Sequence, residues 1–151
     1  MTRISKNPGD LFSLPLSTGG SHGYAQWLND GTARVFLISS ATALPIEQIF
    51  AAKVAFRVLV FKDTPGRYGW VNIGKGPIPD EYSGPQRYAK RDKISGALSI
   101  YFQGVETPAS MEDLHGLETV AVWAHPHIVE RLEAQLAGRP SKFAKAIAVA
   151  T

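Results

Sequence analysis

Cysteine is absent from the 151-residue sequence. Disulfide bonds, thiolate zinc sites and cysteine nucleophiles are therefore excluded. Long apolar runs are also missing, and none approaches the roughly 18 residues of a membrane-spanning helix. Residues 1–10 contain neither the apolar segment nor the cleavage site of a secretory signal. We therefore expect a cytoplasmic protein that has no membrane partner.

Charge is sparse as well. Charged residues make up 19% of the sequence and hydrophobic residues 44%, so the composition differs from that of disordered chains. The length predicts one domain, residues 1–151, with a single core. The net charge of +3 is uneven, because residues 51–100 hold nine Lys and Arg against four Asp and Glu. This surplus permits one basic face but is smaller than that of typical nucleic-acid-binding domains.

Short apolar runs with period-2 alternation predict strands. The Asp30-Gly31 pair between two of these runs predicts a hairpin turn, with positive φ at both turn positions. The run at 55–61 is almost wholly apolar, which is typical of a central strand. The predicted strands cover residues 10–16, 24–29, 32–39, 55–61, 68–74, 96–104 and 117–124.

Two segments have helical spacing. Residues 45–52 predict a short helix with proline in its first turn. Residues 126–138 predict a longer helix that begins at Pro126 and ends before Gly138. Its apolar stripe consists of Ile128, Val129, Leu132 and Leu136. The tail at 141–149 fits either a further helical turn or a closing strand.

The order of these elements predicts an α+β fold. Short connections and hairpin signals favour antiparallel pairing. We expect a curved antiparallel sheet or a small barrel-like sheet. A short internal helix and a C-terminal helix would pack on it.

One motif suggests a serine hydrolase. The stretch Gly19-Gly20-Ser21-His22-Gly23 fits the G-x-S-x-G pattern, but that pattern supports catalysis only on a sharp strand-to-helix turn. Here it joins two predicted strands. We therefore interpret it as a hairpin loop.

Other candidate sites also lack the required spacing. His125 and His127 flank a proline at a helix start, where residues i and i+2 do not share a face, so with His115 they predict no metal site. Gly74-Lys75-Gly76 is followed by prolines and not by the helix of a phosphate loop. Paired carboxylates stand in polar segments and indicate solvated surface: Asp80-Glu81, Glu112-Asp113 and Glu130 with Glu133. We predict a protein that is not an enzyme and has no cofactor or metal.

A basic run supports the alternative hypothesis of a small barrel-like nucleic-acid-binding module. Residues 85–93 place basic side chains around Tyr88, and such a mixture can hold a nucleic-acid backbone. Asp92 lowers the local charge, and a solvated charged turn is the commoner interpretation. The basic residues are Arg87, Lys90, Arg91 and Lys93.

Short segments in one order carry a family resemblance. They resemble the immunity protein 26 family of bacterial polymorphic toxin systems over roughly residues 7 to 137. The resemblance implies a non-enzymatic protein that binds a cognate toxin in the cytoplasm and neutralises it. Inhibitors of nuclease toxins are often acidic, so the charge of +3 implies either a different toxin or contact through the acidic last third. The segments are PGDLFSLPL, GYAQWL, ARVFLIS, FRVLVFKD, YGWVNIGKGPIP, ISGALSIYFQG and GLETVAVWAHPHIVERL.

Protein interfaces favour Trp, Tyr and Arg anchors. Strand alternation over 68–74 predicts that Tyr68 and Trp70 face outward while Val71 and Ile73 face inward. The alternative is that Trp70 belongs to the core. The predicted toxin-binding residues are Arg67, Tyr68, Trp70 and Tyr82.

Overall fold

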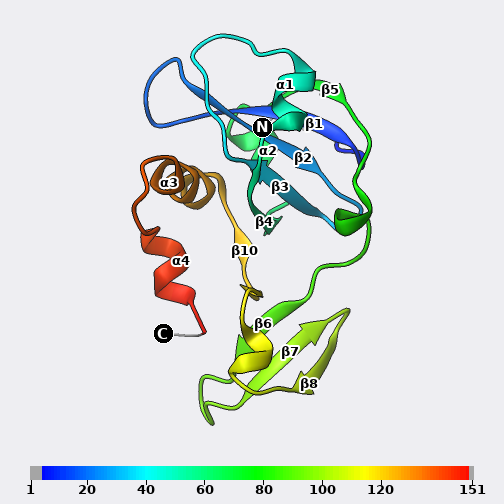
Figure 1. Cartoon of the computed structure of the whole chain (residues 1–151), viewed down its shortest axis with the longest axis vertical. Helices are drawn as coiled ribbons and strands as arrows, with labels where there is room; N and C mark the ends of the chain where they lie inside the picture. The colour runs from blue at the N-terminus through cyan, green and yellow to red at the C-terminus, as the bar shows by residue number, and fades with distance from the viewer. Residues whose placement is uncertain (1–4, 150–151) are drawn as a thin grey trace.

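A computed structural model describes residues 5–149 of the chain, which form a large lobe and a small lobe (Figure 1). The large lobe contains a six-stranded sheet in the order β10-β4-β3-β2-β1-β5. Helices cover both of its faces, so the α+β class is confirmed. The strands are β1 (Asp10–Pro15), β2 (His22–Trp27), β3 (Thr32–Phe36), β4 (Val54–Val60), β5 (Val71–Lys75) and β10 (Val122–Trp123).

The small lobe is built on a four-stranded sheet in the order β8-β7-β6-β9. Both sheets are open, so neither forms a barrel. Each has one parallel pair at an edge, β10 with β4 and β9 with β6, because the chain returns to both sheets through residues 118–123. The strands are β6 (Tyr88–Arg91), β7 (Leu98–Phe102), β8 (Val105–Pro108) and β9 (Glu118–Thr119).

The predicted hairpin between β2 and β3 is confirmed, with a difference in its turn. Leu28 N donates to Thr32 O, so three residues form the connection. Of these, Gly31 alone has a positive φ, at 79°. A three-residue loop needs only its last residue in the left-handed region, which explains why Asp30 does not share it.

One face of the large sheet packs against α3 (His125–Leu136). Ile128 and Leu132 are fully buried there, as the helical stripe predicts. Leu136 is 40% exposed, so the stripe ends one turn earlier than expected. The sheet and helix approach closely at Gly23, where an added Cβ would lie 2.7 Å from Leu132 Cδ2.

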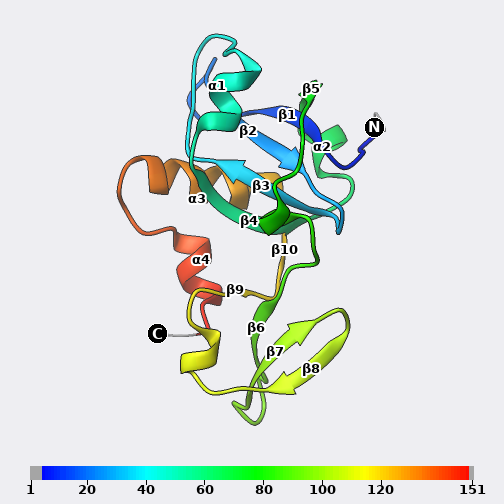
Figure 2. The same cartoon turned by 45° about the vertical axis from the view of Figure 1, so that its right-hand side comes forward.

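The opposite face of the sheet is covered by α1 (Ile46–Ala51), which confirms the predicted short helix. Ile49 of this helix packs among Leu11, Tyr24 and Phe36. The segment after β5 then runs past β3 and β4 to the small lobe (Figure 2). It contains the short helix η1 (Asp80–Tyr82).

The tail forms a helix, α4 (Lys142–Ile147), which descends from α3 toward the small lobe (Figure 1). Glu130 fixes its start by accepting hydrogen bonds from Ser141 Oγ, Lys142 N and Phe143 N. The prediction that Glu130 is merely solvated surface is therefore wrong. Val149 beyond α4 packs on the small lobe. No helix among residues 5–149 is long and apolar enough to span a membrane.

Candidate functional site

Trp70 lies in the core, and the prediction that it faces outward is wrong. Its side chain is 1% exposed and packs against Phe12, with 6.1 Å between the ring centroids. Val71, expected to face inward, is 56% exposed. Trp70 is therefore unavailable as a surface anchor.

The error comes from the backbone before β5. A short helix, α2 (Thr64–Arg67), lies directly before the predicted strand 68–74, and Tyr68 is its C-cap residue. Gly69 follows with a φ of 70°, a conformation that breaks the alternation of side chains. The strand begins only at Val71, so alternation counted from Tyr68 assigns the wrong face.

Tyr68 and Trp70 both contact His125 at the start of α3. Trp70 Nε1 donates to His125 Nδ1 at 2.9 Å, and the Tyr68 ring stacks on the imidazole with centroids 4.9 Å apart. Burial lowers the pKa of His125, and the carbonyl of Pro15 opposes this with a smaller effect. His125 thus joins α2 and α3.

Arg67 and Tyr82 lie apart from this cluster. Arg67 is on the surface of α2, where its guanidinium pairs loosely with Asp63 at 3.9 Å. Tyr82 lies on the other face of the large sheet, with its ring centroid 5.2 Å from Arg34 Cζ. Burial, with Glu81 adding to it, raises the pKa of the Tyr82 hydroxyl. The four predicted binding residues therefore do not form one surface.

A polar network fixes the segment around Tyr82. Asp30 Oδ2 accepts from Arg57 Nη2 at 3.1 Å and from Gln86 N at 3.0 Å. Arg57 Nη2 also donates to Gly84 O at 2.7 Å. Burial alone would raise the pKa of Asp30, but hydrogen bonds from Thr32 and Gln86 and the Arg57 charge hold this pKa below its ordinary value. The network ties the β2–β3 turn, β4 and residues 84–86 into one unit.

A cleft of about 440 Å³ lies between the two lobes beside this network. β10 pairs only with the end of β4, at Leu59 and Val60, so the first half of β4 borders the cleft. Gln86 Nε2 caps the carbonyl of Arg57 at 2.9 Å, while Gln86 Oε1 is buried with no hydrogen-bond partner among the described residues. We call this the interlobe cleft. Its lining includes Phe56, Arg57, Glu81, Tyr82, Gln86, Arg87, Leu117 and Glu118.

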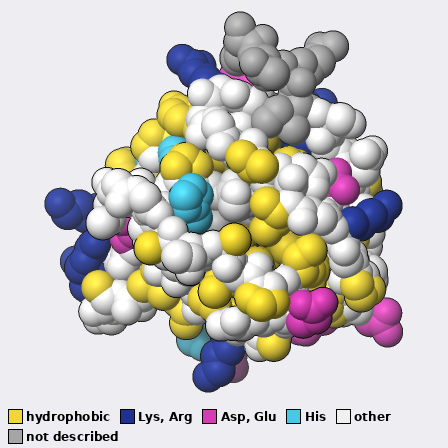
Figure 3. All heavy atoms as spheres, turned by 90° about the horizontal axis from the view of Figure 1, so that it is seen from above, with side chains coloured by type: hydrophobic (Ala, Val, Ile, Leu, Met, Phe, Trp, Pro, Cys, Tyr) yellow, Lys and Arg dark blue, Asp and Glu magenta, His cyan; other side chains and the backbone are white. Residues whose placement is uncertain are grey.

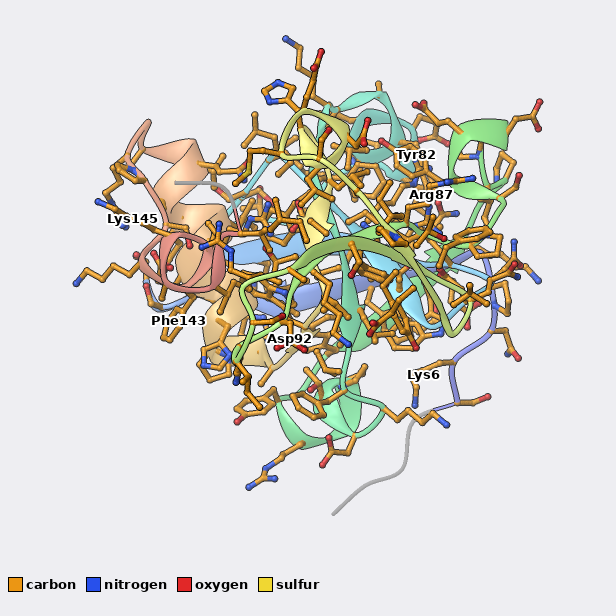
Figure 4. The ribbon with its side chains drawn as sticks, turned by 90° about the horizontal axis from the view of Figure 1, so that it is seen from below. Lys6, Tyr82, Arg87, Asp92, Phe143 and Lys145 are labelled. Carbon is orange, nitrogen blue, oxygen red and sulfur yellow. The ribbon has the colours of Figure 1, made fainter. Side chains whose placement is uncertain are left out.

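The far wall of the interlobe cleft is rigid. Glu118 accepts two hydrogen bonds from Arg131, both at 2.7 Å. Arg131 in turn lies over the rings of Phe56 and Trp123. At the open side, Arg87 lies over Phe102 and is exposed, and Tyr82 and Arg87 lie on the same side of the molecule (Figure 4). The cleft thus combines hydrogen-bonded walls with a rim of half-buried Tyr82 and exposed Arg87.

Tyr88, the aromatic residue at the centre of the basic run, is not an exposed stacking platform. Tyr88 is buried, and burial raises its pKa to about 12. Lys90 pairs with Glu106, and Asp92 accepts from two backbone N–H groups of the β6–β7 turn. Arg91 and Lys93 line a groove of about 590 Å³ beside the end of α4.

A second hollow, of about 350 Å³, lies beside α1. The hydroxyl of Tyr24, one of its polar groups, pairs with Ser40 Oγ at 2.7 Å. On this end of the large lobe, hydrophobic side chains gather near the centre and Lys and Arg lie at the rim (Figure 3). This hollow offers mainly apolar contact.

The hydrolase and metal motifs occupy structural positions. Ser21 lies in the β1–β2 hairpin, where its N–H donates to Thr18 O and its carbonyl accepts from Leu16 N, as the hairpin interpretation predicts. His22 begins β2. Among residues 5–149 no group of three or more His, Asp or Glu side chains is arranged to hold a metal ion.

Sequence reasoning missed Arg34, Arg57 and Gln86. The signal for Arg34 and Arg57 was available, because each is a charged residue that interrupts an apolar strand run, 33–37 and 55–61. Gln86 gave no comparable signal, since its role depends on a contact with Arg57, 29 residues away.

Comparisons of this chain with protein-family models, with curated proteins and with solved structures found no significant match. The resemblance to immunity protein 26 is thus not accompanied by a matching family model. The function is therefore inferred from the site, as a proposal.

Proposed function

We propose that this chain is an immunity-type protein that binds a cognate bacterial toxin in the cytoplasm and neutralises it by occlusion. It acts by binding and not by catalysis. The ordered sequence resemblance over roughly residues 7 to 137 supports this class.

The interlobe cleft is the observation that carries the proposal. Gln86, whose Oε1 has no hydrogen-bond partner among the described residues, stands in its lining. The rim offers Tyr82 and Arg87, residue types that dominate binding energy in protein interfaces. A volume of about 440 Å³ is large enough to admit side chains of a partner.

Rigidity supports binding at this position. The hydrogen bonds of Asp30 hold Arg57 and Gln86 in place before any partner arrives. Binding to a fixed surface loses less conformational entropy than binding to a mobile one. The cleft therefore suits a partner that docks as a folded domain.

Co-expression with the toxin domain encoded beside this gene tests the proposal. The wild-type chain should restore growth and co-elute with the toxin domain. A variant with Tyr82→Ala and Arg87→Ala should lose both properties while keeping its melting temperature within a few degrees. Arg67→Ala is the matched control, because Arg67 is exposed on a different face, and it should remain protective. Growth arrest with the wild-type chain present would refute the function.

The nucleic-acid-binding alternative rests on the groove beside Arg91 and Lys93. It lacks an accessible aromatic side chain, since Tyr88 is buried. Binding of single-stranded or duplex DNA should be weak at physiological salt, with Kd no tighter than about 10⁻⁴–10⁻⁶ M. Tight binding that weakens steeply with salt would favour this alternative.

A further inference from the structure

Arg34 is a buried cation in the middle of the large sheet. It is 5% exposed and stands on the face covered by α1 and η1. Its Cζ lies 4.9 Å from the centroid of Phe36, 5.7 Å from that of Phe50 and 5.2 Å from that of Tyr82. The guanidinium is therefore enclosed by aromatic rings on several sides.

Most of the donors of Arg34 are unused. Nε donates to Gln26 Oε1 at 2.7 Å, and this is its only hydrogen bond to the described residues. Gln26 is held in turn by Gly9 O and Gly76 O. Arg34 forms no ion pair with a described carboxylate. Both Nη groups, with four N–H donors, have no acceptor among residues 5–149. They reach solvent, since they are not among the buried side-chain atoms that lack a partner.

The surroundings only partly compensate this charge. Cation–π contact with three rings is favourable, and the field of Tyr82 and Glu81 raises the pKa of Arg34 against the larger, lowering effect of burial. Arginine nevertheless stays protonated in proteins. Removing most of a guanidinium from water without a carboxylate partner is costly, and its planar pair of Nη groups matches the two oxygens of a carboxylate.

We propose that Arg34 is the receptor for a carboxylate of the bound partner, supplied by an Asp or Glu side chain or a chain terminus. The inference rests on the proposed function and names the partner's chemistry. Tyr82 joins the two sites, because its ring lines the interlobe cleft and also lies against Arg34. A partner docked in the cleft therefore has its surface next to the guanidinium.

The geometry favours a carboxylate over the phosphate of a nucleic acid. A phosphodiester is flanked by two sugars and is normally contacted by exposed arginine and lysine side chains. Arg34, at 5% exposure and behind the Tyr82 ring, is not exposed in that way. A planar carboxylate at the end of a side chain needs only a narrow opening.

Sodium formate is the probe, and the readout is the ¹H–¹⁵N signal of Arg34 Nε in the full-length protein. The signal should shift saturably with formate, with a Kd of about 5–80 mM, and should not shift with sodium chloride at matched ionic strength. Arg57 is an internal control, because its Nε already donates to Thr32 and its Nη2 to Asp30. Its signal should stay in place.

Glu81→Gln provides the matched variant. Glu81 is exposed and lies in the electrostatic field of Arg34, so its removal lessens repulsion of the anion without opening the core. Formate should bind about two- to fivefold more tightly to this variant. Unchanged affinity, or no formate response in the wild-type protein, would overturn the proposal. A response to inorganic phosphate alone would overturn it in favour of a phosphate ligand.

With the neighbouring toxin domain, Arg34→Gln should lose about thirtyfold or more in affinity, and equal affinity would overturn the proposal. If this variant fails to fold, Glu81→Gln serves instead and should bind the toxin more tightly. Formate binding without neutralisation by the wild-type chain would keep the carboxylate site and reject the immunity function. Failure of the carboxylate site and failure of the immunity function therefore give different results.

Discussion

Replacing Trp70 by alanine should strongly destabilise the protein. The indole is 1% exposed and packs between β1 and the start of α3, against Phe12 and His125. Emptying a buried tryptophan site costs about 3–5 kcal/mol. For a chain of this length that corresponds to a fall in melting temperature of about 6–20 °C.

Two variants separate the contributions to this loss. Trp70→Phe keeps most of the ring but removes the N–H that His125 Nδ1 accepts, so it should cost about 1–3 kcal/mol. Tyr68→Ala is the matched control for the same stretch. The Tyr68 ring is half-buried and stacks only on the outer side of His125, so its removal should cost about 0.5–1.5 kcal/mol.

Thermal denaturation followed by far-ultraviolet circular dichroism measures all three variants. The expected order of destabilisation is Trp70→Ala, then Trp70→Phe, then Tyr68→Ala. A Trp70→Ala protein that melts within 2 °C or so of the wild type would refute the core position and restore Trp70 as a surface residue.

Three further perturbations test other parts of the fold. Glu130→Ala should lower the free energy of unfolding by about 1–2 kcal/mol, because α4 loses the carboxylate that caps its start. The effect of Glu130→Ala should be smaller in a protein that already carries Ser141→Ala. Gly23→Ala should cost about 1–3 kcal/mol, since Leu132 is fully buried and cannot move away from the new Cβ; an unchanged melting temperature would place α3 farther from β2. The pKa of His125 is lower in the folded protein than in the unfolded chain, so on acidification the unfolded chain is protonated first. The free energy of unfolding should therefore be highest above pH 6.5 and fall as the pH drops below it. In His125→Gln, the free energy of unfolding should change less between pH 7.5 and 5.5.

Local patterns were sufficient for most elements of the large lobe. The β2–β3 hairpin follows from a turn signal between two apolar runs, and α3 follows from its stripe and its terminal Pro126 and Gly138. These signals are short in range, so no knowledge of tertiary contacts is needed. The same local character explains where they failed. Gly69, just after α2, has a positive φ that no local pattern predicted, and alternation carried across it assigns Trp70 to the wrong face.

Local sequence patterns do not predict the parallel strand pairs or the interlobe cleft. β9 and β10 each have two residues, too few to show a period, and pair with strands far away in the sequence. The cleft depends on Gln86 reaching Arg57, and on Asp30 holding both. Polar residues in a loop are compatible with many partners. The sequence therefore predicted Tyr82 as a binding residue but not its neighbours.

The arrangement of polar groups around Tyr82 supports the proposal that a partner binds there. Asp30, Arg57, Glu118 and Arg131 are paired with several hydrogen bonds each. The Nη groups of Arg34 and Gln86 Oε1 have no hydrogen-bond partner among residues 5–149. The Tyr82 ring lies against Arg34, and Tyr82 and Gln86 both line the interlobe cleft. A bound partner that carries a carboxylate would give the Nη donors of Arg34 the acceptor that the described residues do not supply.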